Sequence, residues 1–498
     1  MVLVVVLVVI AMLTLAGFTF TEWMMSERQA VQIYGRKLQA AALADSGVEA
    51  VKQFAMLTPE LQQDQGGRFD NPGLFRAVVV ADDPSPVDRG SFTIIAPKIA
   101  NGNLGGIRFG LENESARLNL NVLLIADTQQ ENGGRTLLMN LPGMTEAIAD
   151  AIMDWIDPDS DPREFGAEVE FYSGLAEPYA PNNGPPETVE ELLLVRDVTP
   201  LLLFGPDSNR NGQLDLHESA AAGGMRDANG DDITHGWADY MTLYSAESNL
   251  APDGTPKIDL NGSDAQVLYT ALEEALGAEI ATFIVAYRQN GPYTGTKTGQ
   301  KGAAVELDLT KPPKTNVTTV LDLIGQRAQV TPAGAKDPTI IETPFPKEPL
   351  LMNAYLPLLL DWVAVNTQPT IPARININEA PRAVLLGIPG LTPEIVDEII
   401  AKRDSEPTDE KPERRHETWL MSEGLITLEQ MKAIIPYVTS GGRIFRAQVV
   451  GFYEGIGPVA RSEVIVDASG ATARVLLWRD LTHLGRGYSW DTLGATPQ

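Results

Sequence analysis

The residues with the clearest chemical spacing form a twelve-residue acidic segment, Asp207 to Glu218, which reads DSNRNGQLDLHE. Oxygen-bearing side chains stand at positions 1, 3, 5, 9 and 12, Gly212 suits a sharp turn at position 6, and position 7 offers its backbone carbonyl. Ca²⁺ prefers about six to eight oxygen ligands, and calcium loops supply them with this spacing. The expected calcium ligands are Asp207, Asn209, Asn211, Gln213, Asp215 and Glu218.

Gly205 and Pro206 directly precede this segment, so no long helix enters it, and we expect a calcium loop in a different scaffold from that of a helix-flanked sensor. Hard oxygen ligands of this kind suit a structural Ca²⁺ and give no argument for catalysis. The alternative is a solvated acidic loop that binds no metal.

Two further acidic runs are weaker candidates. The run Asp157 to Glu168 reads DPDSDPREFGAE, with Pro162 where glycine is expected and Phe165 at position 9. Its expected ligands are Asp157, Asp159, Asp161 and Glu168. A third group, Asp227 to Asp232, has no acid at the twelfth position and is at most a partial loop.

The sequence gives little support for an enzyme. It has no cysteine, which excludes a disulfide framework, thiolate zinc sites and cysteine nucleophiles. No nucleophile with a plausible base and no glycine-rich phosphate loop is found. The four histidines are too scattered for a histidine-rich metal centre: His217, His235, His416 and His483. We therefore expect a non-enzymatic protein.

The charge of the chain also restricts its partners. Its 498 residues carry 38 lysines and arginines against 66 aspartates and glutamates, a formal net charge of −28. A charge this negative repels a phosphate backbone, so we expect no nucleic-acid partner. The length exceeds one compact core and suggests about two to four domains.

The elements that must position these residues begin with a membrane segment. Residues 1–20 carry no charged side chain, and about 20 helical residues span roughly 30 Å, the thickness of the hydrocarbon core of a bilayer. The basic start and small-residue cleavage site of a secretory signal are missing. Apolar residues continue at spacings of three and four to about Met56, which predicts one long helix that enters a soluble domain. An ordinary single-pass anchor with a helical stalk is the simpler alternative.

Two groups of strand-like runs frame the rest of the chain, at about 74–81, 91–96 and 107–112 and again at 445–453, 462–468 and 472–480. Each group alone is too short for a stable domain. We therefore expect an α+β fold in which a small antiparallel sheet is interrupted by a large helical insertion. Proline- and glycine-rich linkers are predicted at about 289–302 and 331–350.

The predicted insertion contains an internal repeat. Three times an Asn-rich tripeptide, beginning at Asn119, Asp259 and Asn376, precedes two helical runs joined by a hairpin. In each copy two isoleucines four residues apart place an apolar ridge on the second helix. These pairs are Ile148 and Ile152, Ile280 and Ile284, and Ile395 and Ile399.

Helix-hairpin-helix units often bind DNA through a helix N-terminus. Here a threonine and a glutamate follow the turn, as Thr145 and Glu146 in the first copy and as Thr392 and Glu394 in the third. A threonine cap and a carboxylate in the first turn serve the helix itself and compete with phosphate. We therefore expect a packing role, with a membrane-anchored DNA receptor of the competence type as the alternative.

Four motifs follow the uncharged N-terminal segment, namely RLNLN, LPGMTEAIADAIMDWIDPDSDP, FGAE and RININEAPRAVLLGIPGLTPEIVDEIIAKR. With the long helix and the split β region, they make nearly the whole chain resemble the K-type minor pseudopilins of the type II secretion system. The resemblance implies a pilin-like fold with a large inserted α-domain of SAM-like hairpins. It also implies a place at the tip of a periplasmic pseudopilus and a role in its assembly and in protein export across the outer membrane.

The resemblance further implies other minor pseudopilins as partners, along with inner-membrane secretion components and secreted cargo. It implies a single-pass inner-membrane protein held by residues 1–20, with the soluble body in the periplasm. Most pseudopilins carry a glutamate at the fifth mature position. The K type lacks it, and here Val5 stands there if Met1 is the first mature residue. We expect Met1 to be the mature terminus or an internal start, and the missing carboxylate fits a terminal subunit.

The predicted organisation has six segments. They are 1–21, the transmembrane helix; 22–58, the amphipathic stalk; 59–112, the first part of the β region; 113–440, the inserted helical domain with hairpin repeats at 117–157, 257–290 and 374–404 and the calcium-type loop at 207–218; 441–482, the second part of the β region; and 483–498, a tail.

Overall fold

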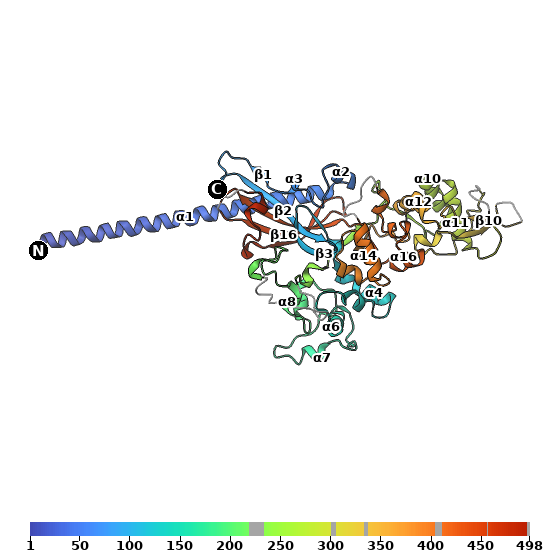
Figure 1. Ribbon diagram of the computed structural model, residues 1–498, viewed down its shortest axis with the longest axis horizontal. Helices are drawn as coiled ribbons and strands as arrows, with labels where there is room; N and C mark the ends of the chain where they lie inside the picture. The colour runs from blue at the N-terminus through green and yellow to red at the C-terminus, as the bar shows by residue number, and fades with distance from the viewer. Residues whose placement is uncertain (219–233, 300–304, 333–336, 404–410, 456, 496–498) are drawn as a thin grey trace.

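The N-terminal half of one long helix projects from the rest of the molecule. The computed structural model describes residues 1–218, 234–299, 305–332, 337–403, 411–455 and 457–495, so the third acidic group lies outside the described residues. Helix α1 spans Val2–Met56, and Figure 1 shows it leaving the head as a rod. Its first part is long and apolar enough to cross a membrane, with a mean hydropathy of 2.9, and none of that part is buried. The predicted continuous helix is therefore confirmed.

The C-terminal part of α1 packs on the sheet. Its buried face begins at Ala40 and ends at Ala55, with small residues at the closest approach. A Cβ added at Gly451 would lie 2.2 Å from the carbonyl oxygen of Ala40 and 2.5 Å from the amide nitrogen of Ala44. Because these are backbone atoms of the helix, only glycine lets helix and strand come so close.

The sheet joins the two predicted β regions. Its strands follow the spatial order β1, β2, β15, β16, β17, with β3 paired to β2 and β4 paired to β15. Strands β2 and β15 are antiparallel from the pair Gln448 and Ile95 to the pair Tyr453 and Gly90. The strand bounds are β1 Val78–Ala81, β2 Gly90–Ala100, β3 Asn103–Arg108, β4 Glu112–Asn113, β15 Ile444–Tyr453, β16 Ala460–Asp467 and β17 Arg474–Asp480. The interrupted antiparallel sheet is thus confirmed.

Three sequence predictions need correction, two of them in this sheet and one in the insertion. Residues 74 and 75 belong to the short helix α3, Pro72–Phe75, because Asn71 caps it and Pro72 stands at its first position. The run 107–112 is divided between β3 and β4, and residues 109–111 belong to neither strand. The predicted linker 331–350 contains β10, Thr339–Glu342, which forms a hairpin with β9, Arg327–Val330.

Between β4 and β15 lies the inserted domain, whose buried residues form one continuous apolar cluster. Figure 1 places this domain beneath the sheet and beyond the C-terminal end of α1. Its helices are α4 Leu123–Gln129, α5 Gly133–Leu138, α6 Glu146–Ile156, α7 Val169–Tyr172, α8 Pro200–Phe204, α10 Ala265–Leu276, α11 Ala278–Asn290, α12 Pro349–Trp362, α13 Arg382–Leu386, α14 Pro393–Lys402, α15 Trp419–Ser422 and α16 Leu428–Ile434.

The three Asn-rich tripeptides have the same local structure. In each, the first side chain accepts a hydrogen bond from the backbone N–H two residues later: Asn119 from Asn121 at 2.9 Å, Asp259 from Asn261 at 2.8 Å, and Asn376 from Asn378 at 2.9 Å. The first residue of each tripeptide also ends a two-residue strand that is paired in parallel with another short strand. The pairs are β5 Leu118–Asn119 with β6 Met241–Thr242, β8 Ile258–Asp259 with β11 Val363–Ala364, and β13 Ile375–Asn376 with β14 Val438–Thr439. The sequence repeat therefore encodes a turn that starts each helical unit.

The isoleucine ridges lie in the core of the inserted domain. Ile152, Ile284 and Ile399 are fully buried, and their partners four residues earlier pack against the same cluster. Two successive helices follow each tripeptide, with α10 and α11 as the longest such pair. The helix-hairpin-helix assignment of these units stays a prediction.

Candidate functional site

The predicted calcium loop is closed by its first and last acids. Asp207 accepts hydrogen bonds from the backbone N–H groups of Asn211, at 3.2 Å, and Gly212, at 2.7 Å. Glu218 accepts at Oε1 from the Ser208 N–H and at Oε2 from the Asp215 N–H, both at 3.0 Å. Both carboxylates are buried, so the loop turns its charged ends inward, as a cation loop must.

The middle residues of the loop offer more oxygen atoms. Asn209 Oδ1 is buried and has no hydrogen-bond donor in the described part of the chain. Asn209 Nδ2 donates to Asp215 Oδ2 at 2.8 Å, and the Gln213 N–H donates to Asn211 Oδ1 at 2.7 Å. Gly212 has a φ of 73°, in the left-handed region that the sixth position of such a loop requires. All six predicted ligands therefore lie on one compact loop.

One residue that the calcium spacing does not include also lies at this loop. Asp215, His217 and Glu218 each present a ligand atom, and these atoms lie within 4.8 Å of one another. The twelve-residue pattern assigns no role to its eleventh position, and only the spatial arrangement groups His217 with the two acids. Its imidazole is mostly exposed.

The charge balance of the loop follows from burial. Burial raises the pKa of Asp207 to about 6, because desolvation disfavours the carboxylate more than its two backbone hydrogen bonds favour it. Burial acts in the same direction on the pKa of Glu218, but hydrogen bonds from Asp215 and Ser208 outweigh it and lower that pKa. A bound cation would hold Asp207 in its ionised form.

The outer side of the loop docks on the pilin-like sheet. Arg461 of β16 donates to the carbonyl oxygens of Asn209 and, at 3.0 Å, Arg210. Gln448 of β15 donates to the Arg210 carbonyl at 2.7 Å. These contacts join segments that are far apart in the sequence, so the local spacing of the loop residues does not predict them.

The second acidic run also brings three acids together. Asp157, Asp159 and Glu168 each present an oxygen atom within 4.8 Å of the others. Two oxygens bound to one Ca²⁺ can be at most about 5 Å apart, because each Ca–O distance is about 2.3–2.6 Å. Asp161, the fourth predicted ligand, is exposed and lies outside the group, and its N–H donates to Asp159 at 2.9 Å.

Burial distinguishes this second group. Glu168 is 3% exposed and Asp157 is 5% exposed. Both carboxylate oxygens of Glu168 and Oδ1 of Asp157 are buried without a hydrogen-bond donor among the described residues. Leaving such charged oxygens unpaired is costly, and a divalent cation is the partner that their arrangement suits.

Helix ends bring this group together. Helix α6 is capped by Thr145 and ends at Ile156, directly before Asp157, while Glu168 precedes the first residue of α7. Arg163 donates to Asp154 at 2.8 Å and also to Asp157, so one guanidinium faces several carboxylates. Burial and then the neighbouring Asp154 and Asp157 raise the pKa of Glu168. The group thus has an excess of negative charge that a cation would neutralise.

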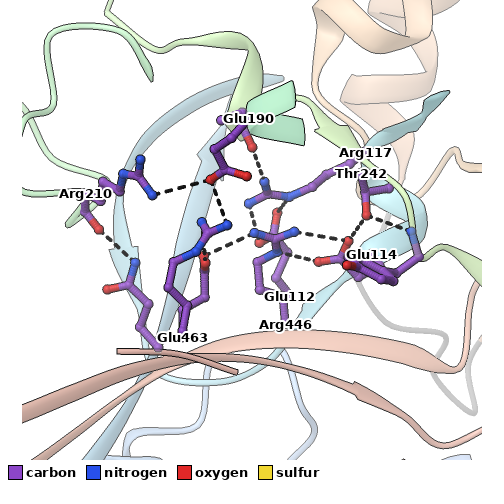
Figure 2. Close-up of polar contacts among 12 residues, drawn as sticks. Glu112, Glu114, Arg117, Glu190, Arg210, Thr242, Arg446 and Glu463 are labelled. Atoms are coloured by element: carbon purple, nitrogen blue, oxygen red, sulfur yellow. Dashed lines mark hydrogen bonds and ion pairs between the residues drawn. The ribbon is translucent and has the colours of Figure 1, made fainter. Parts of the chain in front are cut away.

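A network of buried ion pairs joins the inserted domain to the sheet, as Figure 2 shows. Arg446 of β15 contacts Glu114 from the start of the insertion and, at 3.1 Å, Glu463 of β16. Arg117 forms a two-pronged pair with Glu112, with distances of 2.9 and 2.8 Å. Glu190 of the insertion forms another ion pair, with Arg479 of β17 at 2.7 Å. Charged groups from both sides of the junction therefore fix the two parts together.

The network favours the ionised form of two of its carboxylates. Burial acts to raise the pKa of Glu114, but the guanidinium groups of Arg446 and Arg117 outweigh it and lower that pKa. The pKa of Glu463 is also lowered, because Arg446 and Arg479 outweigh burial. For Glu112 burial prevails, and its pKa is raised despite Arg117.

In a DNA receptor, the N-termini of α6 and α14 would bind phosphate, but here threonine side chains of the same hairpins cap them. Thr145 accepts a hydrogen bond from the Ile148 N–H at 3.3 Å, and Thr392 accepts one from the Ile395 N–H at 3.4 Å. A glutamate occupies the first turn of both helices. These ends are built for the stability of their own helices.

A long helix packed on an antiparallel sheet, with a helical domain inserted between the strands, defines a pilin-like protein. Its N-terminal segment is long and apolar enough to anchor it in a membrane. Residues 116–203 match the model of the family described as "Type II secretion system (T2SS), protein K". This match supports the resemblance of the chain to the K-type minor pseudopilins. The family consists of structural components of secretion.

A solved structure is similar over most of its length, although at low identity. It is a chain in the crystal structure of the GspK-GspI-GspJ complex from the type 2 secretion system of enterotoxigenic Escherichia coli. The identity is 12% and the TM-score 0.32, over 91% of this chain and 99% of that chain. The comparison with curated proteins gave no match. The similarity to the protein K family therefore rests on residues 116–203.

Proposed function

We propose that this chain is a minor pseudopilin, a non-enzymatic subunit at the tip of the type II secretion pseudopilus that takes part in pseudopilus assembly and in protein export across the outer membrane. The observation that carries the proposal is the position of the inserted domain, which lies beyond the C-terminal end of α1 (Figure 1). In a filament whose subunits stack with their α1 helices parallel, a domain beyond the C-terminal end of α1 occupies the space that a subunit added at that end would need. The chain then closes the stack and does not extend it.

Helix α1 supports both membrane anchoring and later packing. Residues 1–20 carry no charge and suit a single span of the inner membrane, with the head in the periplasm. Beyond this span, Met25, Ile33, Tyr34 and Leu38 are each more than half exposed. Exposed apolar side chains outside the bilayer favour contact with the helices of other pseudopilins.

A site-specific photo-crosslinking experiment tests this assembly role. The full chain, with the crosslinker at Ile33, is expressed with the other minor pseudopilins of the same system. We expect adducts with these pseudopilins, and many fewer from Glu27, a polar and exposed position on the same helix. A chain that forms no adduct with any of them would overturn the assembly role. A tight complex with duplex DNA at low salt would instead favour the DNA receptor.

We also propose two structural Ca²⁺ sites in the inserted domain. The first uses the loop Asp207 to Glu218, and the second uses Asp157, Asp159 and Glu168. The buried oxygens without donors at Asn209 and Glu168 support the proposal. The test is isothermal titration of the full chain in detergent with Ca²⁺. We expect binding at two sites, one lost in Asp207→Ala and the other in Glu168→Gln, and no binding heat would refute both sites.

A further inference from the structure

We propose that a cleft between helix α2, Pro59–Asp64, and the inserted domain binds the free carboxylate end of an apolar peptide, with Arg443 as the side chain that holds the carboxylate. The inference depends neither on the position at the tip nor on the cation sites. No local sequence pattern predicts such a site, because the residues that line the cleft come from segments that are far apart in the sequence.

The cleft has a volume of about 810 Å³ and is lined by both parts of the molecule. Gln62, Arg68 and Phe445 belong to the pilin-like part, whereas Val320 and Leu360 belong to the inserted domain. Ligand pockets usually have volumes of about 300–1,000 Å³, mostly apolar walls and a few polar groups that fix the ligand. The cleft is therefore large enough for the end of a peptide.

Arg443, which lies between β14 and β15, is a basic residue of this lining without an acidic partner among the described residues. Its Nε donates to the Ala468 carbonyl at 3.2 Å and its Nη1 to the Leu57 carbonyl at 3.4 Å. In the described part of the chain, no acceptor is bonded to its Nη2. A guanidinium has five N–H groups in a planar fork, so Arg443 keeps donors for the carboxylate of a ligand.

The electrostatic surroundings of Arg443 favour an anion. Burial lowers the pKa of Arg443, the nearby Arg68 lowers it further, and Asp467 acts in the opposite direction. Arg68 is held in place by a two-pronged ion pair with Glu379, with 3.2 Å between Nη1 and Oε2 for one of the two contacts. Asp467 is already bonded to Arg474 at 2.7 Å. A carboxylate from a ligand would supply the negative charge that Arg443 lacks, through two parallel hydrogen bonds.

The other basic side chains that line the cleft already have acidic groups beside them. Their ion pairs are Arg374 with Glu247 at 2.9 Å, Arg415 and His416 with Asp361 at 2.6 and 2.7 Å, and Lys432 with Asp322 at 3.1 Å. Lys257 donates to the Leu360 carbonyl at 2.6 Å. Burial lowers the pKa of Lys257, and the nearby Glu247 and Glu417 oppose this effect. Arg443 is thus the position in the cleft where one negative charge of a ligand is needed.

The walls and the charge of the cleft indicate the class of ligand. Its apolar side chains include Val320, Val363, Val365, Ile371 and Ile435. Glu60, Glu247 and Glu417 also line it, so a multiply charged ligand such as phosphate is repelled. The last residue of a peptide carries its carboxylate and its side chain on the same Cα, so it places a single charge beside an apolar group. A peptide end therefore fits better than an acidic side chain, whose backbone must continue in both directions.

Fluorescence anisotropy of a labelled peptide, titrated with the full chain in detergent, tests the site. The peptide ends in Val-Leu-Ile with a free carboxylate, and the control is the same peptide with a C-terminal amide. We expect the free acid to bind more tightly by about tenfold or more, because the amide lacks the charged hydrogen-bond acceptor. Equal affinity for the two peptides, or no binding of either, would overturn the site.

A third peptide, with an internal glutamate and an amidated end, separates the two sources of a carboxylate. We expect it to bind as weakly as the amide control. If it binds as tightly as the free acid, the assignment to a peptide end is wrong.

Two variants test the role of Arg443. Arg443→Met should abolish the preference for the free acid over the amide. Arg415→Met removes a paired arginine from the same cleft and should change that preference by less than about threefold. A preference that persists in Arg443→Met, or that is lost in Arg415→Met alone, would overturn the role of Arg443.

A measurement on the unmodified chain covers the case in which Arg443→Met fails to fold. The free-acid peptide carries a photo-crosslinker on its penultimate side chain, and the adducts are mapped by mass spectrometry. We expect adducts in residues 59–68 and 439–445, and we expect excess unlabelled free acid, but not the amide, to suppress them. Adducts confined to other parts of the chain would overturn the inference.

Discussion

The junction between sheet and insertion predicts a large effect of one substitution, Arg446→Met. The Arg446 side chain lies between Glu114 and Glu463, and the Glu114 side chain is fully buried. Methionine fills similar space but leaves both carboxylates without this partner. Removing one member of a buried ion pair typically costs about 3–5 kcal/mol, because the remaining charge is buried without compensation. That is a large fraction of a typical stability of about 5–15 kcal/mol.

The control is Arg474→Met on β17, a strand of the same sheet. Arg474 pairs with Asp467 at 2.7 Å, but its side chain is 70% exposed. Asp467 is buried, but it keeps its hydrogen bonds from Ser469, and its ion pair with a largely exposed guanidinium contributes about 0–1 kcal/mol. The two variants thus remove the same kind of side chain from the same sheet in different environments.

Urea unfolding of the full chain in detergent measures both variants. Tryptophan fluorescence reports on the inserted domain, where Trp237 and Trp419 are fully buried. We expect the midpoint for Arg446→Met to fall clearly below that of Arg474→Met, and Glu114→Gln added to Arg446→Met to recover part of the loss. Equal midpoints for the two arginine variants would refute the conclusion that the ion network joins the two parts.

Further predictions concern the cation loop, acid stability and the helix–sheet contact. Ca²⁺ at about 100 times its dissociation constant should stabilise the full chain by about 2.7 kcal/mol per site, and Asp207→Ala should reduce this gain when melting is followed with and without Ca²⁺. Burial acts to raise the pKa of Asp361, but the hydrogen bonds from His416 and an adjacent arginine outweigh it and hold that pKa below its usual range. The stability this carboxylate contributes is therefore present above about pH 4 and lost as pH falls through the folded pKa. Asp361→Asn should lower the stability at pH 7 and flatten its decrease with acid, measured by unfolding from pH 2 to 7. Gly451→Ala should lower the free energy of unfolding, measured with urea, by about 1–3 kcal/mol or more, because its Cβ would overlap the backbone of α1. Gly35→Ala, with no atom within 4 Å, should be neutral or slightly stabilising, and equal losses in the two glycine variants would contradict the close contact.

Local patterns predicted the main elements well. The uncharged start and the apolar spacing to Met56 predicted α1, because a helix of this length is determined by residues close in sequence. The alternating strands predicted the split sheet. The Asn-rich tripeptides predicted three related units, and the structure adds that each begins with the same turn and a parallel pairing. The short helix α3 was missed because capping by Asn71 outweighed the apolar run that follows it.

The sites were less predictable, since they depend on contacts between distant segments. Spacing ranked the loop that begins at Asp207 above the run that begins at Asp157, yet the second group holds the buried carboxylate oxygens without donors. Asp161 was predicted as a ligand from spacing alone, and the chain turns it outward. The first loop contacts Arg461, which lies 251 positions after Arg210 in the sequence. No local sequence pattern predicts a contact over that separation.

The most direct test of the central claim is the position of this chain in an assembled pseudopilus. Electron microscopy of pseudopili that contain the full chain, labelled at an exposed residue of the inserted domain such as Leu350, gives that position. We predict a single label at one end of each filament. Labels distributed along the filament, or filaments that assemble without this chain at either end, would contradict the tip role.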